Sequence, residues 1–160
     1  DWRLLQLTWP KVDMPALGER WVAASGRGTR LNGVPCRTSA VRRLEEARLY
    51  STSPDAFGPE EADIFAALSA KVGLRRFGGD CYAYGLLACG HVDLVVEAGL
   101  QPYDFLALVP VVEEAGGVIT DWAGTPLSLH SSGAVVAAAN AALHAAALTQ
   151  LETAATVPAV

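Results

Sequence analysis

The second half of this 160-residue chain contains no lysine and no arginine. All 12 Lys+Arg lie in residues 1–80 beside ten acidic residues, whereas residues 81–160 hold seven Asp+Glu. The halves therefore carry charges of +2 and −7, and the net charge is −5. The negative net charge argues against a nucleic-acid binder that relies on a basic surface. The acids of the second half must be solvated, placed at helix N-termini, paired with cations of the first half, or bound to a metal ion.

Cysteine and histidine are scarce, and neither shows the spacing of a metal site. The three cysteines (Cys36, Cys81 and Cys89) form no CxxC pair, and the three histidines show no metal-ligand spacing, so zinc is not expected. An odd number of cysteines leaves at least one unpaired. We therefore expect buried thiols and a cytoplasmic protein, because thiols persist in a reducing compartment.

Long apolar runs are also missing. The longest extends from Phe105 to Val112, far short of the roughly 20 residues of a membrane span, so no membrane partner is expected. Residues 1–5 lack the features of a signal peptide. No P-loop, dinucleotide fingerprint or Ser-His-Asp order is present. The composition, 51% hydrophobic and 18% charged, can fill a core and argues against disorder.

The order of the local patterns predicts an α/β fold. Residues 11–33 alternate extended pieces with turn signals, including Asn32-Gly33, and predict β-hairpins at the edge of a larger antiparallel sheet. From residue 48 onward, strands alternate with helices, which predicts a layered α/β domain. We expect a β-hairpin region over residues 1–47, an α/β domain over 48–152 and a frayed tail over 153–160.

The individual elements follow from periodicity, glycine and proline. Strands are predicted at Arg48–Thr52, Leu74–Phe77, Val92–Ala98, Val118–Thr120 and Ala134–Ala138. Helices are predicted at Pro59–Lys71, Asp80–Cys89, Pro102–Glu114 with a kink at Pro110, and Ala141–Leu151.

Two glycine-rich junctions join a strand to a helix, at Gly78-Gly79-Asp80 and at Gly99 to Asp104. Both place a helix N-terminus at the carboxyl end of a strand, where open α/β sheets bind ligands and free N–H groups favour anions. A tight turn is the alternative for the glycines, and an N-cap is the alternative for Asp80.

Glu97 ends a predicted strand, and Asp104 follows seven residues later at a helix start. Both side chains are expected to face one crevice in the half without cations. A carboxylate there suits Mg²⁺, which prefers oxygen ligands. An N-cap is again the alternative for Asp104, and phosphate chemistry on Mg²⁺ normally needs several carboxylates.

Other polar residues have simpler interpretations. Asp121 to Thr125 faintly resembles a metal loop but is predicted to be a turn between strands. Glu113 and Glu114, at a helix C-terminus, are predicted to be solvated surface. Of Arg75 and Arg76, one is expected to reach an anion or the acidic half, and the other to face solvent.

A series of motifs occurs in a fixed order along the chain, at residues 76–80, 90–93, 97–104, 114–121, Gly124 and 135–144. This series resembles the C-terminal half of the inositol monophosphatase family, and the resemblance covers about residues 12–151. The stretch Pro102-Tyr103-Asp104, where many members read Trp-Asp, resembles the histidinol-phosphate phosphatase branch, as do residues 12–21.

The resemblance implies a layered sugar-phosphatase-like fold that hydrolyses phosphate monoesters with Mg²⁺ and a metal-activated water. Asp104 matches the family's metal-ligand aspartate. Gly78, Gly79 and Asp80 match the segment that contacts substrate, and Glu97 matches an acid that contacts its non-phosphate part. In the histidinol branch, Asp80 and Glu97 would suit a positively charged amine. Histidinol phosphate is therefore the expected substrate, with inositol phosphate or another sugar phosphate as the alternative.

The family's first metal-binding segments are absent from this sequence, including any Asp-Pro-Ile-Asp-Gly-Thr stretch. Residues 1–47 would then be a remnant of the N-terminal antiparallel sheet, and no catalytic base is assigned. A folded module that binds a ligand or partner and hydrolyses nothing is the rival interpretation. The mean hydropathy of +0.26 also predicts a covered apolar surface, and hence a homo-oligomer with the hairpins at its interface.

Overall fold

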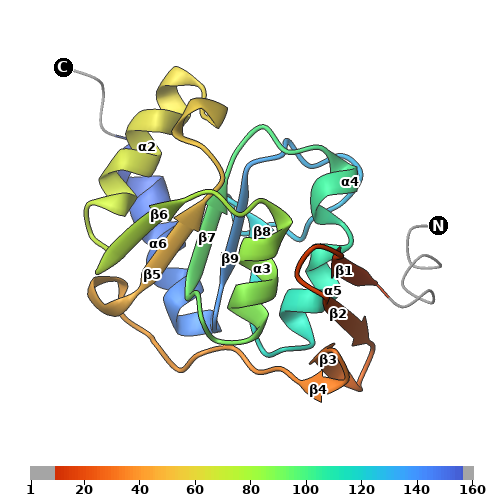
Figure 1. Ribbon diagram of the computed structural model, residues 1–160. Helices are drawn as coiled ribbons and strands as arrows, with labels where there is room; N and C mark the ends of the chain where they lie inside the picture. The colour runs from red at the N-terminus through yellow and green to blue at the C-terminus, as the bar shows by residue number, and fades with distance from the viewer. Residues whose placement is uncertain (1–9, 157–160) are drawn as a thin grey trace.

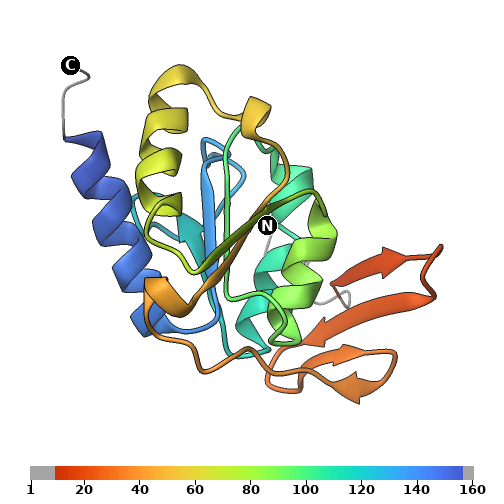
Figure 2. The same ribbon diagram turned by 60° about the vertical axis from the view of Figure 1, so that its left-hand side comes forward.

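The computed structural model describes residues 10–156, which form four layers (Figure 1, Figure 2). A four-stranded sheet forms one outer layer, and a five-stranded sheet lies inside the molecule. Helices α3 (Cys81–Ala88) and α5 (Leu108–Glu113) lie between the two sheets. Helices α2 (Pro59–Ser69) and α6 (Ala141–Ala155) cover the far face of the larger sheet. The predicted α/β class is confirmed.

The four-stranded sheet is antiparallel, with its strands in sequence order. At Asn32 and Gly33 the backbone has φ of 49° and 85°, the left-handed pair that a tight hairpin turn requires. The Asn32 carboxamide oxygen also accepts the Arg20 N–H at 3.0 Å. The predicted hairpins are therefore confirmed. The strands are β1 (Lys11–Met14), β2 (Glu19–Ala24), β3 (Gly28–Leu31) and β4 (Val34–Pro35).

The five-stranded sheet is mixed and has the order β6-β5-β7-β9-β8. Strand β5 pairs in parallel with both β6 and β7, whereas β9 is antiparallel to β7 and β8. The carboxyl ends of β5, β6 and β7 therefore meet at one edge of the sheet. The strands are β5 (Arg48–Ser51), β6 (Leu74–Phe77), β7 (Leu94–Glu97), β8 (Val118–Asp121) and β9 (Val135–Ala138).

The predicted helix over residues 102–114 is wrong in one respect, because it is two helices. Helix α4 (Pro102–Phe105) ends before Leu106, and α5 begins at Leu108. Pro110 has no N–H for the carbonyl of Leu106, four residues earlier, and its ring crowds that carbonyl. The interruption therefore falls one turn before the proline rather than at it.

Three smaller differences concern two unpredicted helices and one helix end. The two short 3₁₀ helices η1 (Leu44–Glu46) and η2 (Pro54–Ala56) were not predicted. Helix α6 continues to Ala155, four residues past the predicted end, and the rest of the expected frayed tail, 157–160, lies outside the described residues.

Alternation along the central strands divides the apolar residues into two cores. On one face, Val95 and Ala137 pack with α3, α5 and Trp21 of β2. On the other, Leu94 and Val96 pack against α2 and α6. The first core contains residues of both sheets, so α3 and α5 are held from two sides. One end of α3 is thereby fixed at the sheet edge where β5, β6 and β7 end.

Two acids of the second half are paired with the first half of the chain. Asp93, fully buried, accepts from the Arg48 side chain at 2.8 and 3.0 Å and from the Arg48 N–H at 2.8 Å. Burial works against its charge, but the hydrogen bonds from Arg48 and Ser39 prevail and lower its pKa. Glu114 was predicted to be solvated surface, and this is wrong. Its carboxylate accepts the N–H groups of Gly26 and Gly28 at 2.9 and 3.0 Å.

Within residues 10–156, no helix has the length and apolar character needed to cross a bilayer.

Candidate functional site

A cavity of about 480 Å³ opens at the carboxyl ends of β5 and β7. Its wall includes three carboxylates from three segments: Asp80 before α3, Glu97 at the end of β7 and Asp104 in α4. None of its lining residues, all within the described part of the chain, is lysine or arginine. The cavity therefore has an acidic wall. The sequence placed Glu97 and Asp104 in one crevice, and the fold adds Asp80 to it.

Glu97 is held rigidly at the base of the cavity. Its side chain is only 4% exposed, and it accepts hydrogen bonds from both the backbone N–H (3.0 Å) and the hydroxyl of Thr52. The Tyr84 hydroxyl makes a longer hydrogen bond of 3.4 Å to the other oxygen. Burial raises the pKa of Glu97, and the donors from Thr52 and Tyr84 oppose that rise. A cation in the cavity would favour the ionised form.

Tyr84 comes from the middle of α3 and is fully buried. Burial raises the pKa of its phenol well above the ordinary value, and the charge of Glu97 adds to the effect. The hydroxyl therefore stays protonated and acts as a donor to Glu97. Helix α3 thus supports the carboxylate that β7 delivers.

Asp104 lies at the third position of α4 and is exposed at the mouth of the cavity. One of its oxygens accepts the Gln101 N–H at 2.8 Å, which joins the helix start to the preceding loop. The carboxylate thus has a structural contact, and its other oxygen is available to a ligand. The N-cap interpretation of Asp104 is wrong, because Gln101 holds that position and Asp104 supports the helix start from its third residue. The metal-ligand interpretation stays a prediction.

The Gly78-Gly79-Asp80 segment has an unusual backbone. Gly78 and Gly79 have φ of 95° and 113°, which explains the two glycines. Asp80 has φ 42° and ψ −132°, although it carries a side chain. Its carboxylate makes no capping hydrogen bond to α3, because a cap needs an extended backbone at that position. Asp80 is therefore the N-cap residue by position, as predicted, but its side chain does not cap the helix. Asp80 lines the cavity, and the two glycines stand just outside it.

Three polar lining residues were not predicted from the sequence: Ser51, Thr52 and Tyr84. Ser51 is 1% exposed, and its hydroxyl has no hydrogen-bond partner among residues 10–156. Ser51 and Thr52 stand at the carboxyl end of a parallel strand, which is the position that could have signalled them. Tyr84 gave no such signal, since it resembles any apolar helix residue.

The expected Mg²⁺ was tested against the donor set. No group of three or more His, Cys, Asp or Glu side chains placed to hold a metal ion occurs in the described chain. Asp104 is one exposed carboxylate, and Glu97 is already engaged by Thr52 and Tyr84. The residues present therefore do not make a complete Mg²⁺ site by themselves.

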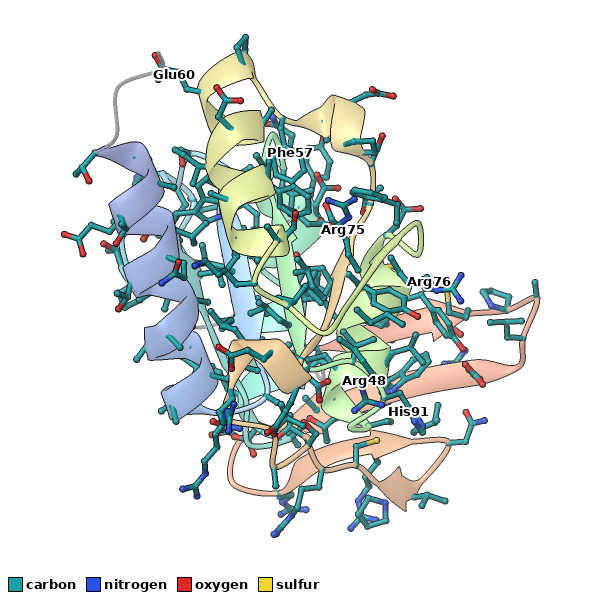
Figure 3. All side chains as sticks on the ribbon, turned by 90° about the vertical axis from the view of Figure 1, so that its left-hand side faces the viewer. Arg48, Phe57, Glu60, Arg75, Arg76 and His91 are labelled. Carbon is teal, nitrogen blue, oxygen red and sulfur yellow. The ribbon has the colours of Figure 1, made fainter. Side chains whose placement is uncertain are left out.

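The two arginines before the Gly-Gly turn do not reach the cavity. They leave β6 in opposite directions, as neighbouring strand residues do (Figure 3). Arg75 donates to the Ser69 hydroxyl at 2.9 Å and lies 5.4 Å from the Phe77 ring centre. Arg76 is exposed. The expectation that one of them reaches the acidic half is therefore wrong.

Asp121 forms the predicted turn. One of its side-chain oxygens accepts the N–H groups of Ala123 and Thr125 at 2.9 and 2.7 Å. That oxygen is engaged by the backbone, as in a side-chain-supported turn.

The family model described as "Inositol monophosphatase family" matches residues 11–155. The chain belongs to this family. The bifunctional phosphatase IMPL2, chloroplastic, of Arabidopsis thaliana is 47% identical over an alignment of 148 residues, which covers 88% of this chain and 43% of that protein. The histidinol-phosphatase of Mycobacterium tuberculosis is 38% identical over 146 residues, 88% of this chain and 55% of the relative. The chain thus spans about half the length of these relatives.

Solved structures of inositol monophosphatases share the fold. One from Zymomonas mobilis superposes with a TM-score of 0.87 at 44% identity, covering 89% of this chain and 56% of that one. One from Anabaena (Nostoc) sp. PCC 7120 gives a TM-score of 0.79 at 27% identity, covering 92% of this chain and 58% of that one. The predicted sugar-phosphatase-like layering is therefore confirmed.

Proposed function

We propose that this chain provides the substrate-binding half of a Mg²⁺-dependent phosphomonoesterase that acts on histidinol phosphate. Family membership supports phosphate-ester hydrolysis. The histidinol-phosphatases of M. tuberculosis and Chlorobaculum parvum, at 38% and 34% identity, support the substrate. The observation that carries the proposal is the acidic wall of the cavity, to which Asp80, Glu97 and Asp104 contribute without any basic lining residue.

The three carboxylates have different proposed roles, which follow from their positions in the cavity wall. Glu97, fixed by Thr52 and Tyr84, offers a preorganised partner for the ammonium or imidazolium group of the substrate. Asp80 offers a second carboxylate at the start of α3. Gly78 and Gly79 have no side chains, so the substrate could approach the backbone at these two residues. A neutral polyol would gain less from this wall than a cation does.

Asp104 is proposed as a ligand of Mg²⁺, which neutralises charge on the phosphate and lowers the pKa of bound water. One exposed carboxylate is too few for such a site, so its other ligands must come from residues outside the described set. The nucleophilic water would be activated there as well. The chain's own contribution is to orient the leaving group against Glu97 and to supply one metal-facing carboxylate.

The incomplete metal site favours a second candidate, a module that binds the ligand without hydrolysing it. In that case Glu97 and Asp80 would still bind a cationic ligand. Mg²⁺ would then have little effect on thermal stability.

The two candidates are separated by measuring phosphate release from histidinol phosphate with and without Mg²⁺. The set comprises the wild type, Asp104→Asn, and Asp63→Asn as a matched acid-to-amide control on the exposed face of α2. Mg²⁺-dependent release that is lost only in Asp104→Asn supports the phosphatase. Inositol phosphate, assayed in parallel, tests the alternative substrate. Histidinol binding by calorimetry with no release in any variant supports the binding module.

A homo-oligomer and a cytoplasmic location remain part of this proposal. Leu17 and Val34 in the four-stranded sheet are 59% and 66% exposed, which supports an interface there. Sedimentation velocity of the wild type beside Val34→Ser tests it. A monomer at all concentrations would contradict the proposed assembly.

A further inference from the structure

Two cysteine sulfurs meet at the junction of the two sheets. Cys36 directly follows β4, Cys89 caps the C-terminus of α3, and their Sγ atoms are 2.9 Å apart. The residues are 53 positions apart in sequence, so the tertiary fold alone brings them together. We infer that Cys36 and Cys89 form a redox-active dithiol that a hydroperoxide converts to an intramolecular disulfide. This inference does not rest on the proposed phosphatase function.

The surrounding groups assign different roles to the two sulfurs. The Trp21 indole N–H donates to Cys89 Sγ at 3.2 Å, so Cys89 is an acceptor. Burial, together with the hydrogen bond to Cys89, raises the pKa of Cys36 to about 12. Cys36 therefore keeps its proton, and its S–H can donate to Cys89 Sγ. Because the Trp21 N–H already donates to Cys89 Sγ, we assign Cys89 as the attacking sulfur and Cys36 as the resolving one.

The reaction balances with a hydroperoxide as the oxidant. The Cys89 thiolate attacks one peroxide oxygen, the O–O bond breaks, and hydroxide leaves as Cys89 becomes a sulfenic acid. Hydroxide takes the proton of Cys36, and the Cys36 thiolate attacks the Cys89 sulfur. The S–O bond breaks as the S–S bond forms, and the hydroxide that leaves takes up the proton that Cys89 lost to solvent on ionising. Two water molecules are therefore released in all. The two thiols lose two electrons in total, and the peroxide gains them.

The third cysteine provides an internal control. Cys81 is half-buried like the other two, but it begins the helix that Cys89 ends. Eight residues of helix separate them by about 12 Å. A disulfide needs Cα atoms within roughly 7 Å, so Cys81 cannot join Cys89 without unfolding α3.

The disulfide would have a structural effect. It would tie the four-stranded sheet to the end of α3, whose other end carries Asp80 at the cavity. The closed loop contains about 50 residues, long enough for a crosslink to restrict the unfolded chain considerably. The oxidised protein should therefore melt at a higher temperature than the reduced one, and a reductant should reverse the difference.

The test is to treat the reduced, folded protein with an equimolar amount of hydrogen peroxide, block free thiols under denaturing conditions, and map the peptides by mass spectrometry without reduction. We expect one linked peptide pair containing Cys36 and Cys89, with Cys81 blocked as a free thiol. Three free thiols, a disulfide that involves Cys81, or only intermolecular disulfides would overturn the inference.

Variants test the assigned roles. In Cys36→Ser, a sulfenic-acid probe should label Cys89, because the resolving thiol is missing. Cys81→Ser should form the disulfide as the wild type does. Labelling of Cys81 in place of Cys89 would show that Cys89 is not the reactive sulfur. The peptide map of the wild type stands without any variant, so a variant that fails to fold does not remove the test.

Discussion

Two aspartates of this chain, Asp93 and Asp13, have very different environments. Asp93 is fully buried and satisfied by Arg48 and Ser39, whereas Asp13 pairs with Arg20 at the surface. A buried charge that loses its partner cannot be rescued by water, but an exposed one can. The energetic weight of each acid is therefore set by its burial.

Asp93→Asn should destabilise the protein by about 3 kcal/mol, because the buried side chain loses its charge-assisted hydrogen bonds and an amide nitrogen cannot accept the donors of Arg48 and Ser39. The value lies at the low end for buried pairs, since the Arg48 side chain is 42% exposed. Asp13→Asn, the matched control at an exposed pair, should cost less than about 1 kcal/mol. Urea unfolding measures both. Equal losses would contradict the importance of burial.

Glu97 should make stability depend on pH in a defined direction. Its pKa is raised above the ordinary value of 4.5 in the folded state, so the folded protein binds this proton more tightly than the unfolded chain does. Its contribution is complete below pH 4.5 and is lost as pH rises through the raised pKa. The free energy of unfolding of the wild type should therefore fall relative to Glu97→Gln as the pH rises above about 4.5. A difference that is constant, or that grows with pH, would contradict this.

At the scale of single elements, α3 approaches β2 very closely. A Cβ on Gly85 would lie 2.8 Å from the Trp21 ring, which is 1% exposed and has no room to move. This glycine is required by the packing, because helix propensity alone would favour alanine.

Gly85→Ala should therefore destabilise the protein by about 1 kcal/mol, since overpacking of about 2 kcal/mol outweighs a propensity gain of about 1 kcal/mol. In a Trp21→Leu background, the same substitution should be neutral or stabilising. Thermal and urea unfolding of the wild type, the two single variants and the double variant complete a double-mutant cycle. If Gly85→Ala also destabilises the Trp21→Leu protein, the clash is not with the Trp21 ring.

The elements were predictable wherever local chemistry determines them. Asn32-Gly33 indicated a hairpin, and short continuous apolar runs indicated the central strands. The break between α4 and α5 was placed wrongly, because the carbonyl that Pro110 leaves without a donor is one turn earlier. The backbone of Asp80 could not be read from sequence at all, because a non-glycine residue at positive φ contradicts local propensity.

At the scale of the whole molecule, Glu114 connects the four-stranded sheet to the helix layer. It lies at the end of α5 and accepts the N–H groups of Gly26, within the β2–β3 turn, and of Gly28, the first residue of β3. Glu113, its neighbour, is exposed. One carboxylate thus fixes the hairpin against the helix layer.

Glu114→Gln should loosen this connection, because an amide nitrogen cannot accept an N–H. We expect amide exchange at Gly26 or Gly28 to accelerate by roughly tenfold, the equivalent of about 1.4 kcal/mol. Glu113→Gln, with the same change in charge, should leave both amides unchanged. Hydrogen exchange followed by NMR provides the measurement, and equal acceleration in both variants would indicate a general charge effect.

The cavity was only partly predictable at this scale. Glu97 and Asp104 are seven residues apart, and their proximity could be inferred from one strand and the following helix. Thr52, which holds Glu97, comes from 45 residues earlier, and only the parallel pairing of β5 with β7 brings them together. Contacts of this kind depend on sheet order, which local patterns do not encode.

The backbone conformation of Asp80, in the wall of the cavity, lowers the stability of the fold. Its φ of 42° suits glycine, and its carboxylate makes no capping bond that would compensate. Asp80→Gly should therefore stabilise the protein by about 1 kcal/mol, whereas Asp104→Gly, in an ordinary helical backbone, should destabilise it. Differential scanning calorimetry compares the two, and a lower melting temperature for Asp80→Gly would contradict the strain. Laboratory evolution for heat resistance alone should replace Asp80 early. Selection for hydrolysis of the proposed substrate, histidinol phosphate, should retain it.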